Sequence, residues 1–238
     1  MQKSVKTLKS ERRIIMIKTR TTTSATDLIN ETLQRGNQIW LTTDWHLITY
    51  DKKTGAISKR PNYDNVIETF SQISEDDLII NLGDLIDSEV EDPFYLEMLR
   101  EDISKIRASM ILIRGNNDVL PNEFYTDTLG IDIFIDGNSF QYEDILFSHA
   151  CEENDVRMNV HGHSHFSCRY YLIKPTNQVD IFNINRTPIL FSDIDKVYED
   201  YWKNNKIEDL TYMGFKTTAD YKAWLKETGQ GNGKGNRQ

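Results

Sequence analysis

The five histidines of this 238-residue chain are placed where metal chemistry could be done. Each lies at or just beyond the end of a short apolar run: His46, His149, His161, His163 and His165. Acids and amides gather at the same places, as Asp44-Trp45-His46, Gly83-Asp84, Gly115-Asn116-Asn117-Asp118 and Gly162-His163-Ser164-His165. Imidazole, carboxylate and amide oxygen together suit Mn, Fe, Co, Ni or Zn better than Ca. Each motif alone is common in turns, but their combined order is specific and indicates a metal site.

Such clusters need strand ends to position them, and the sequence predicts suitable strands. Short apolar runs of strand length occupy residues 39–43, 78–81, 110–114, 145–147 and 158–161. Helical patterns over residues 63–73 and 93–106 separate the first three runs. The first half therefore reads β-α-β-α-β, which predicts parallel strands joined by crossover helices.

The second half is richer in strands. Residues 131–135 and 139–142, with Asp136-Gly137 between them, predict a hairpin, and residues 169–173 and 179–184 predict another pair. Helices are predicted over residues 25–33, 193–202 and 218–227 from their capping residues and closing glycines. Together these elements predict an α/β fold, a four-layer α/β/β/α sandwich of two mixed sheets flanked by helices.

Composition and charge indicate how the chain is divided and which partners are not expected. We expect a basic, flexible leader over residues 1–22, one domain over residues 23–228 and a disordered tail over residues 229–238. The apolar run at residues 14–17 is too short for a signal peptide or a membrane span, so we expect a cytoplasmic protein without a membrane partner. Beyond residue 20 the chain holds 21 Lys and Arg against 36 Asp and Glu, which makes long duplex nucleic acid an unfavourable substrate.

In order and spacing, the motifs resemble the signature of the calcineurin-like metallophosphoesterases, which runs Asp-x-His, Gly-Asp, Gly-Asn-His-Asp/Glu, His and Gly-His-x-His. The resemblance covers residues 38–165, with a softer one over residues 180–195, and the compact form is similar to bacterial and phage members. It implies the four-layer fold and two divalent cations, with Mn²⁺ expected and Fe, Ni, Co or Zn as alternatives. It also implies the metal ligands: Asp44, His46 and His165 on one cation, Asn116, His149 and His163 on the other, and Asp84 between them.

One departure from the family pattern bears on the reaction. Where most phosphomonoesterase members have His after the Gly-Asn pair, this chain has Asn117, which cannot donate a proton to a leaving oxygen. The chain resembles phosphodiesterase members at that position. We therefore expect a phosphoric ester hydrolase that cleaves a phosphodiester or a nucleotide-like phosphate through a metal-bridging hydroxide, with a small phosphate ester as its substrate.

Three residues are candidates for catalytic roles beyond metal binding. Asn117 could hydrogen-bond a phosphate oxygen, His161 could replace the missing acid or play a structural part, and Arg114 could pair with a phosphate. Arg186 is a second candidate for a phosphate contact, and Asp118 is expected to orient a metal-ligating histidine.

Two other functions stay open from the sequence. A phosphomonoesterase or nucleotide pyrophosphatase would tolerate the missing histidine if its substrate had a good leaving group. A non-catalytic scaffold is disfavoured because all seven ligand positions carry competent residues, which are costly to keep near a core. The basic segment 47–63 could form a lid over the metals or a solvated loop.

Overall fold

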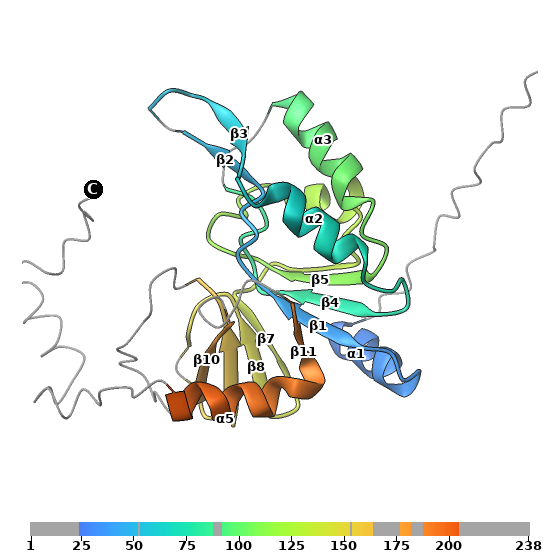
Figure 1. The fold of residues 1–238 in the computed structure, drawn as a ribbon, viewed down its shortest axis with the longest axis vertical. Helices are drawn as coiled ribbons and strands as arrows, with labels where there is room; N and C mark the ends of the chain where they lie inside the picture. Colours follow the sequence, from blue (N-terminus) through green and yellow to red (C-terminus); the bar gives the residue numbers. More distant parts are fainter. Residues whose placement is uncertain are drawn as a thin grey trace, which may run out of the picture.

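Two sheets face each other in the computed structural model, which describes residues 24–51, 53–87, 92–152, 154–163, 177–181 and 188–204. The first sheet has the strand order β11-β1-β4-β5-β6 (Figure 1). Its members are β1 (Ile39–Thr42), β4 (Leu78–Asn81), β5 (Ser109–Ile113), β6 (Ile133–Ile135) and β11 (Ile189–Leu190). The strands β1, β4, β5 and β6 run parallel, and β11 pairs antiparallel with β1.

The second sheet has the order β10-β9-β8-β7. It consists of β7 (Ser139–Tyr142), β8 (Ile145–Ser148), β9 (Met158–His161) and β10 (Gln178–Asp180). The strands β8, β9 and β10 are parallel, whereas β7 and β8 form an antiparallel hairpin. The predicted mixed α/β architecture of two sheets with flanking helices is confirmed.

Two apolar clusters hold these layers together. One lies between the sheets and joins residues such as Ile80 and Ile111 of the first sheet to Phe147 and Val160 of the second. The other lies under α2 (Tyr63–Ser71) and α3 (Pro93–Ile103), which cover the outer face of the first sheet. Because both faces of the first sheet are covered, β1, β4 and β5 are nearly continuous apolar runs rather than alternating ones, with a polar residue only at one end of each.

Further helices and a hairpin complete the described part of the chain. α1 (Ala25–Gln34) begins at Ser24, whose side chain and that of Asp27 form a capping box, and α5 (Ile194–Asn204) follows a short 3-10 helix, η3 (Phe191–Asp193). A single π-helical turn, η1 (Phe124–Thr128), precedes β6. β2 (Ile48–Tyr50) and β3 (Ile57–Lys59) form a hairpin within the basic segment 47–63, and it projects from the sandwich beside α3 (Figure 1).

The predicted elements that the described residues cover agree with the structure except in one place. Residues 131–142 do not form a hairpin: β6 joins the first sheet beside β5, and β7 joins the second sheet beside β8. The turn at Asp136-Gly137 therefore carries the chain between sheets, which a local turn signal cannot reveal. The tight hairpin instead follows β7, where Glu143 takes a φ of 51° without a glycine. Residues 169–173, 218–227, the leader and the tail lie outside the described residues.

Within the described part of the chain, no helix is both long enough and apolar enough to cross a bilayer.

Buried amides, among them that of Asn159, tie the segment between β8 and β9 to the second sheet. Asn159 donates from Nδ2 to the Leu146 carbonyl (3.1 Å) and to Ser148 Oγ (2.7 Å), and its Oδ1 accepts from the Glu152 backbone N–H (2.9 Å). The side chain is fully buried, so these partners have no water to replace it.

We predict that Asn159→Ala lowers the free energy of unfolding by about 3 kcal/mol, because it leaves several buried polar groups without partners. Urea denaturation followed by circular dichroism measures this loss. The exposed Asn138 supplies the control, and Asn138→Ala should change stability by less than about 0.5 kcal/mol. Equal effects of the two variants would contradict this account of the loop.

Candidate metal centre

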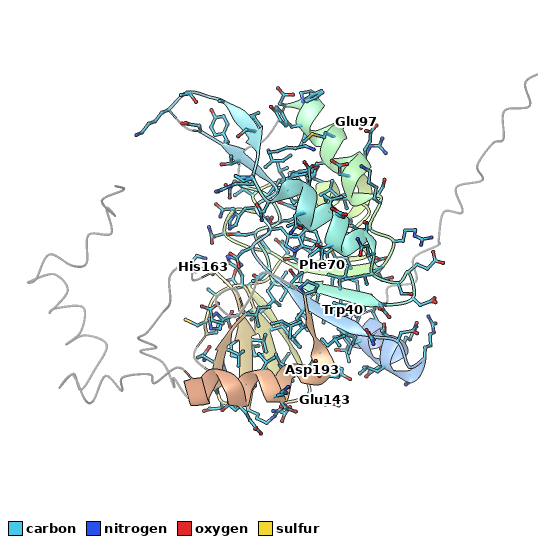
Figure 2. All side chains as sticks on the ribbon, in the orientation of Figure 1. Trp40, Phe70, Glu97, Glu143, His163 and Asp193 are labelled. Atoms are coloured by element: carbon cyan, nitrogen blue, oxygen red, sulfur yellow. The ribbon has the colours of Figure 1, made fainter. Side chains whose placement is uncertain are left out.

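Two triplets of ligand atoms converge at the strand ends, and they share one carboxylate. Asp44, His46 and Asp84 form one triplet, and Asp84, His149 and His163 form the other; within each, the ligand atoms lie within 4.8 Å of one another. The residues follow β1, β4, β8 and β9, whose ends meet where the two sheets come together; Figure 2 labels His163 there. Asp84 is fully buried at their shared point.

The second triplet has the spacing of a metal coordination shell. His149 Nε2 lies 3.0 Å from Asn116 Oδ1, 3.1 Å from His163 Nδ1 and 3.5 Å from Asp84 Oδ2. Two ligand atoms that are each about 2.1 Å from a tetrahedral cation lie about 3.4 Å apart. His149 Nε2 thus lies at ligand spacing from each of these three atoms, one of which belongs to the predicted ligand Asn116.

The first triplet is looser but shares an oxygen with the second. His46 Nε2 lies 3.5 Å from Asp44 Oδ1 and 3.7 Å from Asp84 Oδ2. The same Oδ2 atom of Asp84 therefore faces both His46 and His149. The third residue predicted for this position, His165, lies outside the described residues.

Hydrogen bonds on the far side of two imidazoles leave the ligand nitrogens available. His149 Nδ1 lies 2.9 Å from the Leu82 carbonyl oxygen, which can only accept, so Nδ1 carries the proton. His46 Nδ1 lies 2.5 Å from Asp87 Oδ1. In both rings Nε2 faces the shared carboxylate, as a metal ligand requires.

The backbone at the ligands adopts a conformation that most residues avoid. Asp44, His46, Asp84 and His163 have φ values of 52°, 44°, 55° and 66°. They are four of the five described non-glycine residues with positive φ, the fifth being Glu143 in the β7–β8 turn. The left-handed region is unfavourable for residues with a Cβ, and such residues concentrate at functional sites. The backbone is therefore in an unfavourable conformation at the residues whose side chains converge on the site.

Glycines let the loops approach the ligands closely. A Cβ atom on Gly115 would lie less than 3.0 Å from the backbone nitrogen and carboxylate of Asp84, and one on Gly162 would overlap Thr43 and Asp44. Gly83 combines a φ of 108° with a similar approach to His149 Nδ1. These positions exclude any larger residue without displacement of the ligand beside them.

The buried charges of the site stabilise one another. Burial opposes ionisation of Asp44 and Asp84, yet hydrogen bonds from neighbouring groups hold the pKa of both carboxyls below its usual value. Burial also opposes protonation of His46, but hydrogen bonds with Asp44 and Asp87 raise its pKa to about 9. The pKa of His149 is raised for the same reason, chiefly by Asp84 against the effect of burial. A cation that binds here must displace these protons.

Asp118 acts on the backbone and not, as expected, on a histidine. Its Oδ2 accepts from the backbone N–H groups of Asp84 (2.8 Å) and Gly115 (2.9 Å), and its Oδ1 accepts from that of Leu85 (3.0 Å). Burial raises the pKa of Asp118 to about 6 despite these bonds. The carboxylate thereby ties the loop after β5 to the loop after β4.

The three predicted catalytic residues have different surroundings. Asn117 donates from Nδ2 to Asp84 Oδ2 (2.7 Å) and from its backbone N–H to Oδ1 (2.8 Å). His161 is only 1% exposed, and burial lowers its pKa to about 4, so it is neutral at pH 7. Asn117 and His161 are therefore placed to support neighbouring groups, and neither is placed to donate a proton.

Arg114 lies in a network that does not include the ligand triplets. Its guanidinium donates to Asp136 Oδ1 (2.6 Å), to Asn122 and to the Asp118 carbonyl, and it stacks over the Phe134 ring. With a further bond to the Leu120 carbonyl, these bonds occupy four of its five N–H donors, so the expected phosphate contact gains no support. The other candidate, Arg186, lies outside the described residues.

Two residues at the site were not identified from the sequence. Asp87 bonds to His46, and Arg60 donates from Nη2 to Asp87 Oδ2. Asp87 lies three residues after Asp84, in the same loop, and that spacing was the only local signal for it. Trp45, which lies between the ligand candidates Asp44 and His46, is buried against Phe70 with ring centroids 4.4 Å apart, so it packs in the core.

Comparisons with known proteins place the chain in a family. A family model described as calcineurin-like phosphoesterase matches residues 38–235, which include every motif of the site. No curated protein matches the sequence. A solved protein of unknown function from Aquifex aeolicus is similar at 16% identity and a TM-score of 0.46, over 67% of this chain and 98% of that one. The nuclease MPE of Pseudomonas putida is similar at 19% identity and a TM-score of 0.38, over 53% of this chain and 60% of that one.

We predict that Gly115→Ala destabilises the protein and weakens metal binding, because its methyl group would occupy the space of the Asp84 backbone and carboxylate. The loss of stability should be about 2–3 kcal/mol, as for other overpacked sites. Thermal unfolding and metal titration measure both effects. At Gly137 a methyl group would meet only ordinary contacts, so Gly137→Ala is the control and should behave like wild type.

We also predict that Mn²⁺ stabilises the metal-free protein. At one hundred times its Kd, a cation that binds only the folded state contributes about 2.7 kcal/mol, which corresponds to a rise in Tm of roughly 5–10 °C for a protein of this size. Chelation should reverse the rise, and Asp84→Asn should abolish most of it. If the Tm of wild type and Asp84→Asn rose equally, the cation would be binding elsewhere.

Proposed function

Because the chain belongs to the calcineurin-like phosphoesterase family, whose members are metal-dependent phosphoester hydrolases, we propose that it cleaves a phosphodiester or a nucleotide-like phosphate with two divalent cations. The observation that carries this proposal is the sharing of Asp84 between two ligand triplets. A single carboxylate oxygen that faces His46 and His149 is suited to hold two cations side by side.

The proposal assigns each candidate ligand to one of the two cations. In this proposal Asp44 and His46 bind one cation, Asn116, His149 and His163 bind the other, and Asp84 lies between them, with His165 completing the first set. When bound, the cations would activate a water and neutralise charge on the phosphate. The mixed nitrogen and oxygen ligands are compatible with Mn²⁺, which we propose as the metal.

Asn117 bears on which leaving group the proposed substrate carries. Its amide has no acidic proton, and it donates to Asp84 rather than standing free to meet a leaving oxygen. His161, the other candidate acid, is buried and neutral. A substrate is therefore favoured whose leaving group needs little help from a protein acid, and an alkyl phosphomonoester does not meet that condition.

The charge of the chain limits the substrate further. With a formal net charge of −9, the protein attracts an anion only where cations or local basic groups reverse its field. We therefore propose a small phosphate ester that reaches the metal centre, and not a long duplex bound along the surface.

We predict that the Mn²⁺-loaded protein hydrolyses bis-p-nitrophenyl phosphate faster than p-nitrophenyl phosphate. Asp84→Asn should lower this activity by more than about 100-fold, because it removes the shared ligand itself, whereas loss of an outer partner alone costs about 10–100-fold. The exposed Asp64 gives a matched control, and Asp64→Asn should leave the rate unchanged. Absence of activity on either ester, with two metals bound, would favour the scaffold alternative.

We further predict that Asn117→His improves hydrolysis of phosphomonoesters in proportion to the leaving-group pKa. General acids contribute typically 100- to 10,000-fold, so we expect a gain of about 10-fold or more on glycerol phosphate and little gain on p-nitrophenyl phosphate. Steady-state kcat/KM on both esters, at equal metal occupancy, measures the difference. An equal gain on both substrates would show that the imidazole acts by binding phosphate instead of by donating a proton.

A further inference from the structure

Asp87 connects a metal-ligating histidine to an arginine on a different element. Its Oδ1 lies 2.5 Å from His46 Nδ1, and its Oδ2 accepts from Arg60 Nη2. One oxygen of this carboxylate thus contacts His46 of the site, and the other accepts a hydrogen bond from Arg60, which follows the β2–β3 hairpin. Neither Asp87 nor Arg60 belongs to the two ligand triplets.

The bond from Asp87 fixes how His46 faces the site. The ring could turn about its bond to Cβ, but the Nδ1 contact holds it with Nε2 toward Asp44 (3.5 Å) and Asp84 (3.7 Å). The backbone is held as well, since the His46 N–H donates to the Asp84 carbonyl (2.9 Å). A carboxylate on the outer nitrogen of a ligating histidine sets its tautomer and orientation.

Arg60 links this arrangement to the root of the β2–β3 hairpin. Its backbone N–H donates to the Leu47 carbonyl (3.0 Å), and the Asp87 N–H donates to the Ile48 carbonyl (2.8 Å). The hairpin therefore begins with β2 two residues after His46, and β3 ends one residue before Arg60, which holds Asp87. The Arg60 side chain is 42% exposed, and its Nη2 donor bonds to Asp87, while its buried Nε has no hydrogen-bond partner among the described residues.

We infer that Asp87 and Arg60 are positioning residues of the metal centre, which hold His46 in register with Asp44 and Asp84 and couple the β2–β3 hairpin to that ligand. The inference rests on the proposed function, because it assigns these residues to the metal site proposed there. It also gives the basic segment 47–63 a task at the site that does not require it to cover the substrate.

The charges agree with this role. Burial favours the neutral form of Asp87, but hydrogen bonds from His46 and Arg60 outweigh it and lower its pKa to about 2. The carboxylate is thus ionised throughout the neutral range and remains an acceptor for the Nδ1 proton when Nε2 is bound to a cation. Without Arg60 the same carboxylate would lose its second partner and would be free to rotate.

The direct test is calorimetric titration of Mn²⁺ into metal-free wild type, Asp87→Asn and a matched control. Asp144→Asn is suitable as the control because Asp144 also pairs with an arginine, Arg157 at 2.7 Å, but belongs to neither triplet. We expect Asp87→Asn to weaken one of two binding events by 10- to 100-fold and Asp144→Asn to leave both unchanged. Unchanged binding by folded Asp87→Asn would overturn the inference, whereas failure of wild type to bind metal would overturn the proposed function.

Variants of Arg60 and the state of the imidazole complete the test if Asp87→Asn does not fold. Arg60→Gln should weaken the same binding event by about 10-fold, and Arg60→Lys should restore part of the loss, since it keeps a cation beside Asp87. Nitrogen-15 spectra of metal-loaded wild type should show His46 protonated on Nδ1. A His46 protonated on Nε2, or Arg60→Gln that binds as wild type does, would overturn the positioning role.

Discussion

The structure depends on the burial of one carboxylate, Asp84, at the point where the two sheets meet. A buried charge is costly unless it is paired and hydrogen-bonded, and Asp84 is both. Asn117 contributes a backbone and a side-chain donor, and the imidazoles of His46 and His149 approach the same oxygen. The residue is also held through its backbone, because its N–H is bound by Asp118 and its carbonyl accepts from His46. The loops after β1, β5 and β8 therefore each reach this residue by at least one contact.

The fold supplies these contacts through the direction of its strands. In each parallel set the strand ends lie along one edge, so residues far apart in sequence, such as Asp44 and His163, become neighbours, with the His163 N–H 2.9 Å from Asp44 Oδ2. The loops then turn sharply, which explains why four ligands have positive φ and why glycines stand beside Asp84 and Asp44. Such turns and close approaches cost stability, and the inter-sheet core and the helices over the first sheet offset that cost. A site of this kind persists only because the layers around it are rigid.

Much of this arrangement could be predicted from local patterns, and some of it could not. The apolar runs and the polar residues after them located β1, β4, β5, β8 and β9, since a buried strand leaves a clear signal in the sequence. The pairing of β6 and β7 with different sheets was missed, because the same turn residues serve a hairpin and a crossing between layers. Asp87 and Arg60 were missed for another reason: they lie 41 and 27 residues from the partners that define them. Their roles depend on contacts that exist only in the folded protein, so no local sequence pattern indicates them.

The position of Asn117 follows from the same constraint as the rest of the site. A histidine there would offer an acid to the leaving oxygen. It would not provide the hydrogen bond that the Asn117 side-chain amide donates to Asp84 Oδ2 at 2.7 Å. With Asn117, the chain holds its buried carboxylate by two bonds from one residue and places no acid from that loop beside the substrate. The bonds of Arg114 are directed to Asp136, Asn122 and backbone carbonyls, so the loop after β5 supplies structure and the ligand Asn116 rather than proton transfer. The choice of substrate at such a site is then set by the leaving group, because cations can stabilise its charge but only a protein acid or water can give it a proton.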